Sequence, residues 1–462
     1  MSFISIEFLM LVLITFGLYY LRALRRFQVI TLVAASLVFY AWDQWRLLPL
    51  LMLTVFVTYV SMNGAIRGSR TLAIFGILSN LLILCFFKYK FLVIPDPSDV
   101  HSGSDILDFL LQLPLPIGIS FFVFHNISLI VDYFKYGVDR ERPTAEQVVL
   151  YIIFFPQLIS GPITRAISFL PQIESKFLKD IPWIQVGCLL ITGLFFKLFC
   201  ANNLAQVTAQ MAPEFSSNLA GGDRLFLLFV YSFQIYADFF GYSTIALGLA
   251  LLFGYRLPVN FRMPYTANSF SDFWNRWHIS LSMWLRQYLY IPLGGNRISS
   301  VRTYMNLIIV MILGGLWHGA ALSYAVWGLA HGVLLAGERF GARIFESYSP
   351  DYRFNLVCKI TYSGFVFLCV SLCWLLFRFQ EFSQASVYFL SILDSPHRFR
   401  LSVGYYCLAF MYMLPVFLQH VLAPYVDFTT WHKAVAGVFF ASLLWLALAE
   451  RGADTQFIYF RF

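Results

Sequence analysis

The sequence predicts an all-α integral membrane protein that crosses the bilayer many times. Of its 462 residues, 59% are hydrophobic and only 12% are charged, whereas charged residues make up about 25% of a soluble domain. A single water-soluble core stops growing near ~250–300 residues, so it could not hide this much apolar surface. A hydrocarbon core of ~30 Å needs about 20 apolar residues per helix, so the chain has enough apolar sequence for roughly ten or more spans.

Long apolar runs follow one another along nearly the whole chain. Only helices and closed barrels satisfy their backbone groups in lipid, and the runs lack the alternating pattern of barrel strands. No internal repeat and no low-complexity linker is visible, so we expect one membrane domain over residues 1–462. The expected spans lie near residues 6–24, 28–45, 47–66, 71–88, 116–135, 145–160, 184–200, 223–253, 303–321, 322–343, 356–378, 402–422 and 431–448.

Basic residues lie in alternate short connections between the early runs. The positive-inside rule explains these clusters and the net charge of +8 without a nucleic acid partner, and it predicts that the N-terminus lies outside the cytoplasm. After residue 160 this alternation fails, which predicts a re-entrant or short segment there. The residues predicted on the cytoplasmic side are Arg22, Arg25, Arg26, Arg67, Arg70, Lys135, Arg140 and Arg142. Those predicted outside are Asp96, Asp99, Asp105 and Asp108. The basic residues that fall on the predicted outer side, against the rule, are Arg165, Lys176 and Lys179.

His318 is an ionisable residue inside an apolar run, in the stretch Gly314-Gly315-Leu316-Trp317-His318-Gly319. Such residues are costly in a membrane unless they have a partner or a task. A buried imidazole favours its neutral form, which can take a proton from a hydroxyl as the hydroxyl attacks a thioester carbonyl. The alternative is a packed histidine that bonds a neighbouring helix.

His331 follows His318 by about 3.6 helical turns, so one straight helix would put the two rings on opposite faces. Both can reach one site only if the chain bends between them, and Gly319 to Ser323 is where we expect the bend. His331 is thus a further catalytic candidate, with packing beside Gly328 and Gly332 as the alternative.

The stretch 254–302 carries many charges among aromatic residues, so it must line a cavity or lie at the membrane interface. Within it, Trp274, Trp277 and Leu281 recur at helical spacing and predict an amphipathic helix that also holds His278. Taken alone, this helix fits an interfacial anchor. The sharper hypothesis is a site for a polar cofactor, in which guanidinium groups pair with the phosphates of coenzyme A. Its arginines are Arg276, Arg286, Arg297 and Arg302, and cytosolic loop charge of the positive-inside kind explains Arg297 and Arg302 equally well.

Asp238 stands in an apolar helix, where a carboxylate must pair with a cation or be protonated. Gln234 lies four residues earlier on the same face, so we expect a structural hydrogen bond between the two and not a catalytic role. The seven cysteines lie in or beside apolar runs, and we interpret them as small buried hydrophobes. No zinc-ligand spacing and no phosphate-binding loop appears, so no metal is expected.

Several stretches together resemble the membrane-bound O-acyltransferase (MBOAT) family, in particular its bacterial branch of alginate O-acetyltransferases. They occur in the expected order over most of the chain. They are Pro116–Phe122, Leu158–Arg165, Asn260–Tyr265, Trp274–Arg286, Tyr290–Arg297, Trp317–Gly319 and Phe457–Phe462. One departure is that Thr244 stands where many relatives have an aspartate, so no function is transferred to that position.

The resemblance implies a multi-spanning helical bundle with a transmembrane tunnel and re-entrant or interfacial helices. It implies His318 and His278 as catalytic residues, and we expect Arg276, Arg286, Arg297, Trp274 and Trp277 to bind the donor. The donor it implies is acetyl-CoA on the cytoplasmic side of a bacterial inner membrane, with no permanently bound cofactor. The acyl group would pass outward through a partner acetyltransferase to an exported glycan such as alginate or peptidoglycan.

Two other classes of function stay open at this stage. One is an acyltransferase with another donor or acceptor, such as D-alanyl transfer to teichoic acid or protein lipidation. The other is a transporter or flippase without enzymatic activity. Transporters often show paired halves with broken helices at matching positions, and no such duplication is visible here.

Overall fold

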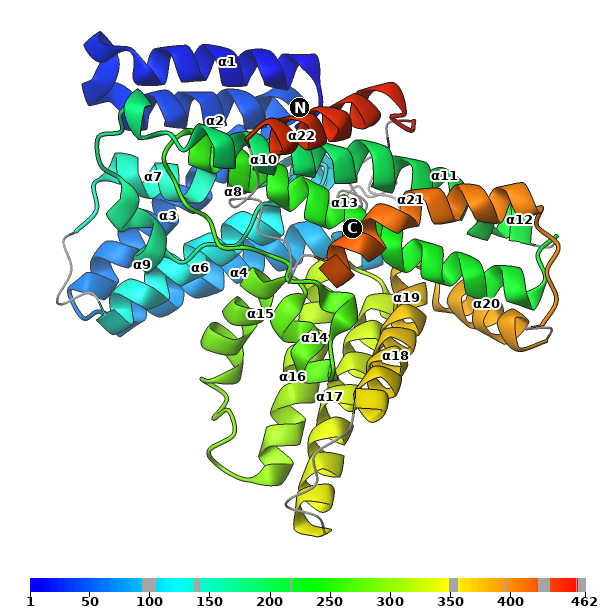
Figure 1. Ribbon diagram of the computed structural model, residues 1–462. Helices are drawn as coiled ribbons and strands as arrows, with labels where there is room; N and C mark the ends of the chain where they lie inside the picture. The colour runs from blue at the N-terminus through cyan, green and yellow to red at the C-terminus, as the bar shows by residue number, and fades with distance from the viewer. Residues whose placement is uncertain are drawn as a thin grey trace. The chain divides into compact units, whose positions relative to one another are not determined.

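A computed structural model describes residues 1–93, 105–136, 142–216, 218–348, 356–394, 397–422, 433–453 and 455. Every regular element within these ranges is a helix (Figure 1). Seven helical stretches there are long and apolar enough to cross a membrane, which confirms the predicted multi-pass, all-α class. They are Arg22–Ile66, Arg70–Lys90, Trp183–Met211, Gly221–Leu252, Ser300–His318, Val357–Arg378 and Val403–Leu422.

The chain divides into two compact units, and the first comprises Met1–Leu190 and Ser243–Pro258. Its longest helices are followed, after residue 153, by the short segments that the charge pattern predicts. The elements are α1 Ile6–Tyr20, η1 Arg22–Phe27, α2 Gln28–Gln44, η2 Trp45–Leu47, α3 Leu48–Ile66, α4 Arg70–Val93, α5 Asp105–Gln112, α6 Ile119–Tyr136, α7 Ala145–Ile153, α8 Phe155–Leu158, α9 Ala166–Phe169, η5 Leu170–Gln172, η6 Leu178–Asp180 and the first part of α10 Trp183–Leu194.

Two of the stretches that resemble the acyltransferase family pack together in this unit. Gly118, at the start of α6, has φ +74°, and a side chain there would meet the Leu158 carbonyl oxygen at 2.6 Å. Further along α6, His125 accepts a hydrogen bond from the Thr164 backbone N–H at 3.2 Å. Position 118 therefore requires glycine, both for its positive φ and for the close approach of the Leu158 carbonyl.

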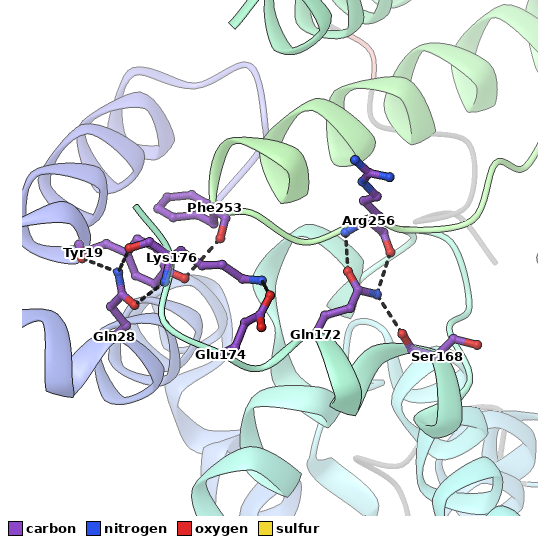
Figure 2. A network of polar contacts seen from close by, with 8 residues as sticks. All are labelled: Tyr19, Gln28, Ser168, Gln172, Glu174, Lys176, Phe253 and Arg256. Carbon is purple, nitrogen blue, oxygen red and sulfur yellow. Dashed lines mark hydrogen bonds and ion pairs between the residues drawn. The ribbon is translucent and has the colours of Figure 1, made fainter. Parts of the chain in front are cut away.

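Two glutamines hold the segment 168–176 in place (Figure 2). The Gln28 side chain donates to the Lys176 carbonyl at 2.9 Å and accepts from the Lys176 N–H at 3.0 Å. Gln172 makes the same pair of bonds with the backbone of Arg256, at 3.1 and 2.7 Å. Each amide thus satisfies one N–H and one C=O that no helix or sheet satisfies.

The second unit comprises Ile191–Tyr242 and Val259–Phe462. All the predicted site residues lie in this unit, on its helices or in the short connections between them. Its elements are η7 Phe195–Ala201, α11 Asn202–Thr208, η8 Ala209–Met211, α12 Pro213–Ser216, α13 Gly221–Leu252 up to Tyr242, η9 Pro264–Thr266, α14 Phe270–Arg276, α15 Ile279–Leu285, η10 Arg286–Tyr290, α16 Ser300–His318, α17 Leu322–Tyr348, α18 Leu356–Cys373, α19 Leu375–Arg378, α20 Phe382–Asp394, α21 Val403–Leu422 and α22 Lys433–Ala449.

Helices α16 and α17 form a tightly packed hairpin (Figure 1). Small residues line the contact: a side chain at Gly328 would meet the Met311 carbonyl oxygen and lie 2.8 Å from the Ile312 Cα atom. A side chain at Gly332 would lie 2.8 Å from the Ile308 Cα atom. Glycines at such positions allow two membrane helices to approach backbone to backbone.

The predicted spans lie at helices of the structure, but the two sets differ in detail. The run 145–160 breaks at Phe154 into α7 and α8, and neither α5 nor α20 was expected. Cys85 and Cys407 are exposed, so the expectation that all cysteines are buried is wrong for these two; an apolar span has a lipid-facing side as well as a buried one. The terminal stretch Phe457–Phe462, Asp96, Asp99 and Arg140 lie outside the described residues. The single-domain hypothesis for residues 1–462 stays a prediction.

We expect Gly328→Ala to destabilise the protein by about 1–3 kcal/mol, because the added methyl group collides with backbone atoms of α16 that cannot move away easily. The matched control is Gly337→Ala on the same helix, where no atom lies within 4 Å of the added group. That variant should unfold at the wild-type temperature or slightly above it, since alanine favours helix over glycine. Thermal unfolding in detergent measures both, and equal unfolding temperatures would contradict the proposed packing.

Candidate active site

Two of the predicted histidines face one tryptophan inside the α16–α17 hairpin. His318 is the last residue of α16, and its ring centroid lies 5.3 Å from that of Trp327 on α17. His331, one turn further along α17, lies 4.7 Å from the same ring. All three side chains are buried. The chain breaks between α16 and α17, at residues 319–321, so the bend that the sequence required is confirmed.

His278 belongs to the same aromatic cluster through Trp317. Its ring lies 6.1 Å from Trp317 and 4.7 Å from Phe239, and the residue is fully buried. The stretch around it lies outside the membrane-spanning helices, and burial lowers the pKa of its imidazole to about 3. The ring is therefore neutral near pH 7 and can exchange a proton but adds no positive charge.

The predicted continuous helix over 274–286 is wrong. The structure has two short helices, α14 and α15, that are separated by Trp277 and His278. His278 adopts the left-handed conformation, with φ 42° and ψ 53°. That conformation costs a non-glycine residue about 1–2 kcal/mol, and histidine carries no helix-breaking signal in a sequence. Such strain is often found at functional sites.

Trp274 and Trp277, which were expected to bind the donor, are both buried in the cluster. Trp274 lies 5.1 Å from the His331 ring, and Trp277 lies 4.8 Å from Trp374. Their exposed fractions are 9% and 1%, so they shape the surroundings of the histidines and present little surface to a polar ligand.

The predicted donor-binding arginines fall into two groups. Arg276 donates to Asp272 at 2.8 Å and to the Thr266 hydroxyl at 3.2 Å, so its guanidinium already has partners in the protein. Arg286 and Arg297 are exposed. The loop of Arg297 is held by Asn306, whose amide donates to the carbonyls of Leu293 and Gly295 at 3.2 and 3.0 Å.

Helix α16 connects that basic loop to the histidine cluster. Asn306 and His318 lie on the same helix, and the rise per residue places them about 18 Å apart along its axis. An exposed cationic loop at one end and a buried imidazole at the other suit an elongated ligand with anionic groups at one end and a reacting group at the other.

The expected pairing of Asp238 with Gln234 is wrong. Asp238 accepts a hydrogen bond from the Lys197 ammonium group at 2.6 Å, and both side chains are buried. Gln234 accepts from the Thr208 hydroxyl instead. The preference for a structural role of Asp238 stays a prediction. Its partner is Lys197, because an ammonium group compensates a buried carboxylate better than an amide does.

Three residues of this region were not singled out from the sequence. Lys197 could have been found, because a lysine within the apolar run 184–200 needs a partner. Asn260 lies in a stretch that resembles the family, and Ser280 donates to its side chain at 2.6 Å. Glu338 accepts from the backbone N–H groups of Phe270 and Ser271 at the start of α14, at 2.9 and 3.1 Å. The contacts of Asn260 and Glu338 join residues that are far apart in the sequence, so no local sequence pattern predicts them.

Comparison with known sequences defines the class of protein. The profile of the membrane-bound O-acyltransferase family matches residues 8–379. The chain therefore belongs to this family, and it is an O-acyltransferase.

Named relatives narrow the comparison further. The chain is 37% identical over 399 residues to the probable alginate O-acetylase AlgI of Pseudomonas aeruginosa, covering 83% of this chain and 73% of that protein. It is 33% identical over 390 residues to the peptidoglycan O-acetyltransferase of Helicobacter pylori, covering 78% and 72%. The teichoic acid D-alanyltransferase of Bacillus subtilis is 28% identical over 313 residues, covering 64% and 75%.

We expect Lys197→Ala to destabilise the protein by about 3–5 kcal/mol, because it leaves the Asp238 carboxylate buried without its cation. The double variant Lys197→Met, Asp238→Leu should be closer to the wild type than either single alanine variant, since it removes both charges together. The matched control is Glu174→Ala in the Lys176–Glu174 pair, whose carboxylate is 74% exposed; its effect should stay below about 1 kcal/mol. Unfolding in detergent measures all four, and a wild-type stability of Lys197→Ala would contradict the expectation.

Proposed function

We propose that this protein is a membrane O-acetyltransferase of the bacterial inner membrane. It takes acetyl groups from cytoplasmic acetyl-CoA and passes them across the membrane to an extracytoplasmic partner protein, which acetylates an exported polysaccharide such as alginate or peptidoglycan. The observation that carries the proposal is the convergence of His318 and His278 on Trp317 in a buried cluster, within a chain of the acyltransferase family.

The proposed chemistry needs one neutral imidazole. His318 takes the proton of the acceptor hydroxyl while the hydroxyl oxygen attacks the thioester carbonyl carbon. When the tetrahedral intermediate collapses, the carbon–sulfur bond breaks and the imidazolium returns its proton to the departing sulfur, which leaves as the free thiol of CoA. The alternative role of His318 is a relay that carries the acetyl group itself. His278 orients the donor or polarises its carbonyl, and His331 is a further candidate because neither of its ring nitrogens has a partner within the described residues.

The proposed topology follows from charge. CoA is polyanionic and stays on the side where it is made, whereas an acetyl group is small enough to pass along a narrow tunnel. The exposed Arg286 and Arg297 suit the CoA phosphates, because guanidinium groups pair with phosphate in a two-pronged geometry. The positive-inside rule places the N-terminus outside the cytoplasm. Arg276 is a weaker candidate because Asp272 neutralises it.

Identity to the two O-acetylating relatives is higher than identity to the teichoic acid D-alanyltransferase, which favours acetyl over D-alanyl transfer. Membranes that contain the protein should release thiol from acetyl-CoA, and labelled acetyl groups should appear on the exported polysaccharide. Consumption of a D-alanyl thioester and not of acetyl-CoA would replace the proposed donor. Flux of substrate without any thioester consumption would favour a transporter.

We expect His318→Ala to abolish acetyl transfer while the protein still reaches the membrane, because the variant lacks the imidazole that takes the proton of the acceptor hydroxyl. The measurement is the acetyl content of the exported polysaccharide in cells in which the variant replaces the wild-type gene. His397→Ala, at an exposed histidine of the same unit, is the control and should keep wild-type acetylation. Full acetylation with His318→Ala would refute the catalytic assignment.

We expect Arg297→Gln to raise the KM for acetyl-CoA about tenfold or more with little change in kcat, because a charge-assisted hydrogen bond to a phosphate contributes ~1.5–3 kcal/mol and that phosphate does not react. Thiol release from acetyl-CoA in membranes gives both constants. The control is Arg398→Gln, an exposed arginine elsewhere in the same unit, for which neither constant should change. An unchanged KM for Arg297→Gln would remove this residue from the donor site.

A further inference from the structure

His278 occupies the N-cap position of α15 without capping it. A residue at the N-cap normally has extended backbone angles and accepts a hydrogen bond from the first turn with its own side chain. His278 is instead left-handed, and its side chain makes no capping bond. Met263 is the other non-glycine residue with positive φ in the described part of the chain, and it lies in the segment that runs beside His278.

Asn260 holds the first two residues of α15 from outside the helix. Its backbone carbonyl accepts the N–H of Ile279, the first residue of α15, at 3.0 Å. Its side-chain oxygen accepts the hydroxyl of Ser280, the second residue, at 2.6 Å. Asn260 and Ser280 are 1% and 3% exposed, so both bonds are shielded from water. Hydrogen bonds in the protein interior are stronger than in water, and losing one there is costly.

A second bond closes the other side of the break. The N–H of Arg262 donates to the carbonyl of Arg276, the last residue of α14, at 3.0 Å. The segment 260–262 is thereby attached to the chain immediately before and immediately after Trp277 and His278. The far end of α14 is fixed by Glu338 of α17, which also accepts from the Tyr362 hydroxyl at 2.8 Å.

We propose that Asn260 is a positioning residue for His278: its side chain binds the Ser280 hydroxyl and its backbone carbonyl accepts the Ile279 N–H. These two bonds fix the start of α15 and so hold the left-handed break that directs the imidazole to Phe239 and Trp317. A side chain that caps its own helix must turn back to the backbone. The His278 side chain makes no such capping bond, and its ring packs instead against Phe239 and Trp317. The inference rests on the proposed function, because Asn260 can affect the reaction through His278 only if His278 takes part in it.

The test compares Asn260→Ala, Ser280→Ala and the double variant in the full chain, with thiol release from acetyl-CoA in membranes as the readout. We expect each single variant to lower kcat about tenfold and to change KM less than twofold. A tenfold change corresponds to the net free energy of roughly one buried hydrogen bond. The double variant should be no slower than the singles, because both remove the same bond. Ser280→Thr keeps the hydroxyl and should restore most of the rate.

The matched control is Ser371→Ala, which removes a buried hydroxyl–hydroxyl bond to Ser232 of 3.0 Å in the same unit. It should lower the unfolding temperature as much as Ser280→Ala does and leave kcat unchanged. If Ser371→Ala slows the reaction equally, the role of Asn260 is one of general stability and the inference fails. A rate within twofold of wild type for both Asn260→Ala and Ser280→Ala also overturns it.

His278→Ala separates this inference from the proposed function. If His278→Ala is inactive and Asn260→Ala is not impaired, Asn260 has no positioning role and the proposed function stands. If His278→Ala keeps the wild-type rate while His318→Ala is inactive, the role of His278 is refuted and the inference falls with it. If His278→Ala and Asn260→Ala both lose kcat with KM kept, both hold.

Discussion

The close approach of α16 and α17 is the contact on which the candidate site depends. Glycines let the two backbones touch, so that His318 at the end of one helix and His331 within the other face the same Trp327 ring. A wider separation would fill with lipid or with larger side chains, and the two histidines would no longer share a neighbour. In a membrane, where helices gain little from apolar burial against one another, such close packing is a main source of association.

Around this hairpin, aromatic rings and backbone hydrogen bonds play different parts. Phe and Trp rings surround the three histidines and leave them almost no contact with water. The hydrogen bonds lie one layer further out, at Asn260, Ser280 and Glu338. Aromatic packing tolerates some sliding, whereas hydrogen bonds fix distance and direction. The outer layer therefore determines where the inner rings point, as is required of a site built to orient reactants.

Charged side chains of the second unit lie in different surroundings. The buried Asp238 pairs with Lys197, and the half-buried Arg276 pairs with Asp272. Arg286 and Arg297, which were expected to bind the donor, are exposed. Cations that face water next to a helix leading to a buried imidazole fit a donor whose charge stays outside and whose acyl group enters. The family assignment agrees with this division, since O-acyl transfer needs a reactive centre shielded from hydrolysis.

The sequence by itself determined the membrane class, the position of nearly every long helix and the family, because apolar run length and order of motifs are local properties. It also placed the bend between His318 and His331, since helical periodicity allows no other route to a common site. Only the tertiary structure decided that His278 breaks a helix, that Lys197 pairs with Asp238, and that Asn260 binds Ser280 at the start of α15. Each of these depends on residues separated along the chain and adjacent in space, and the spacing of residue types carries no record of such contacts.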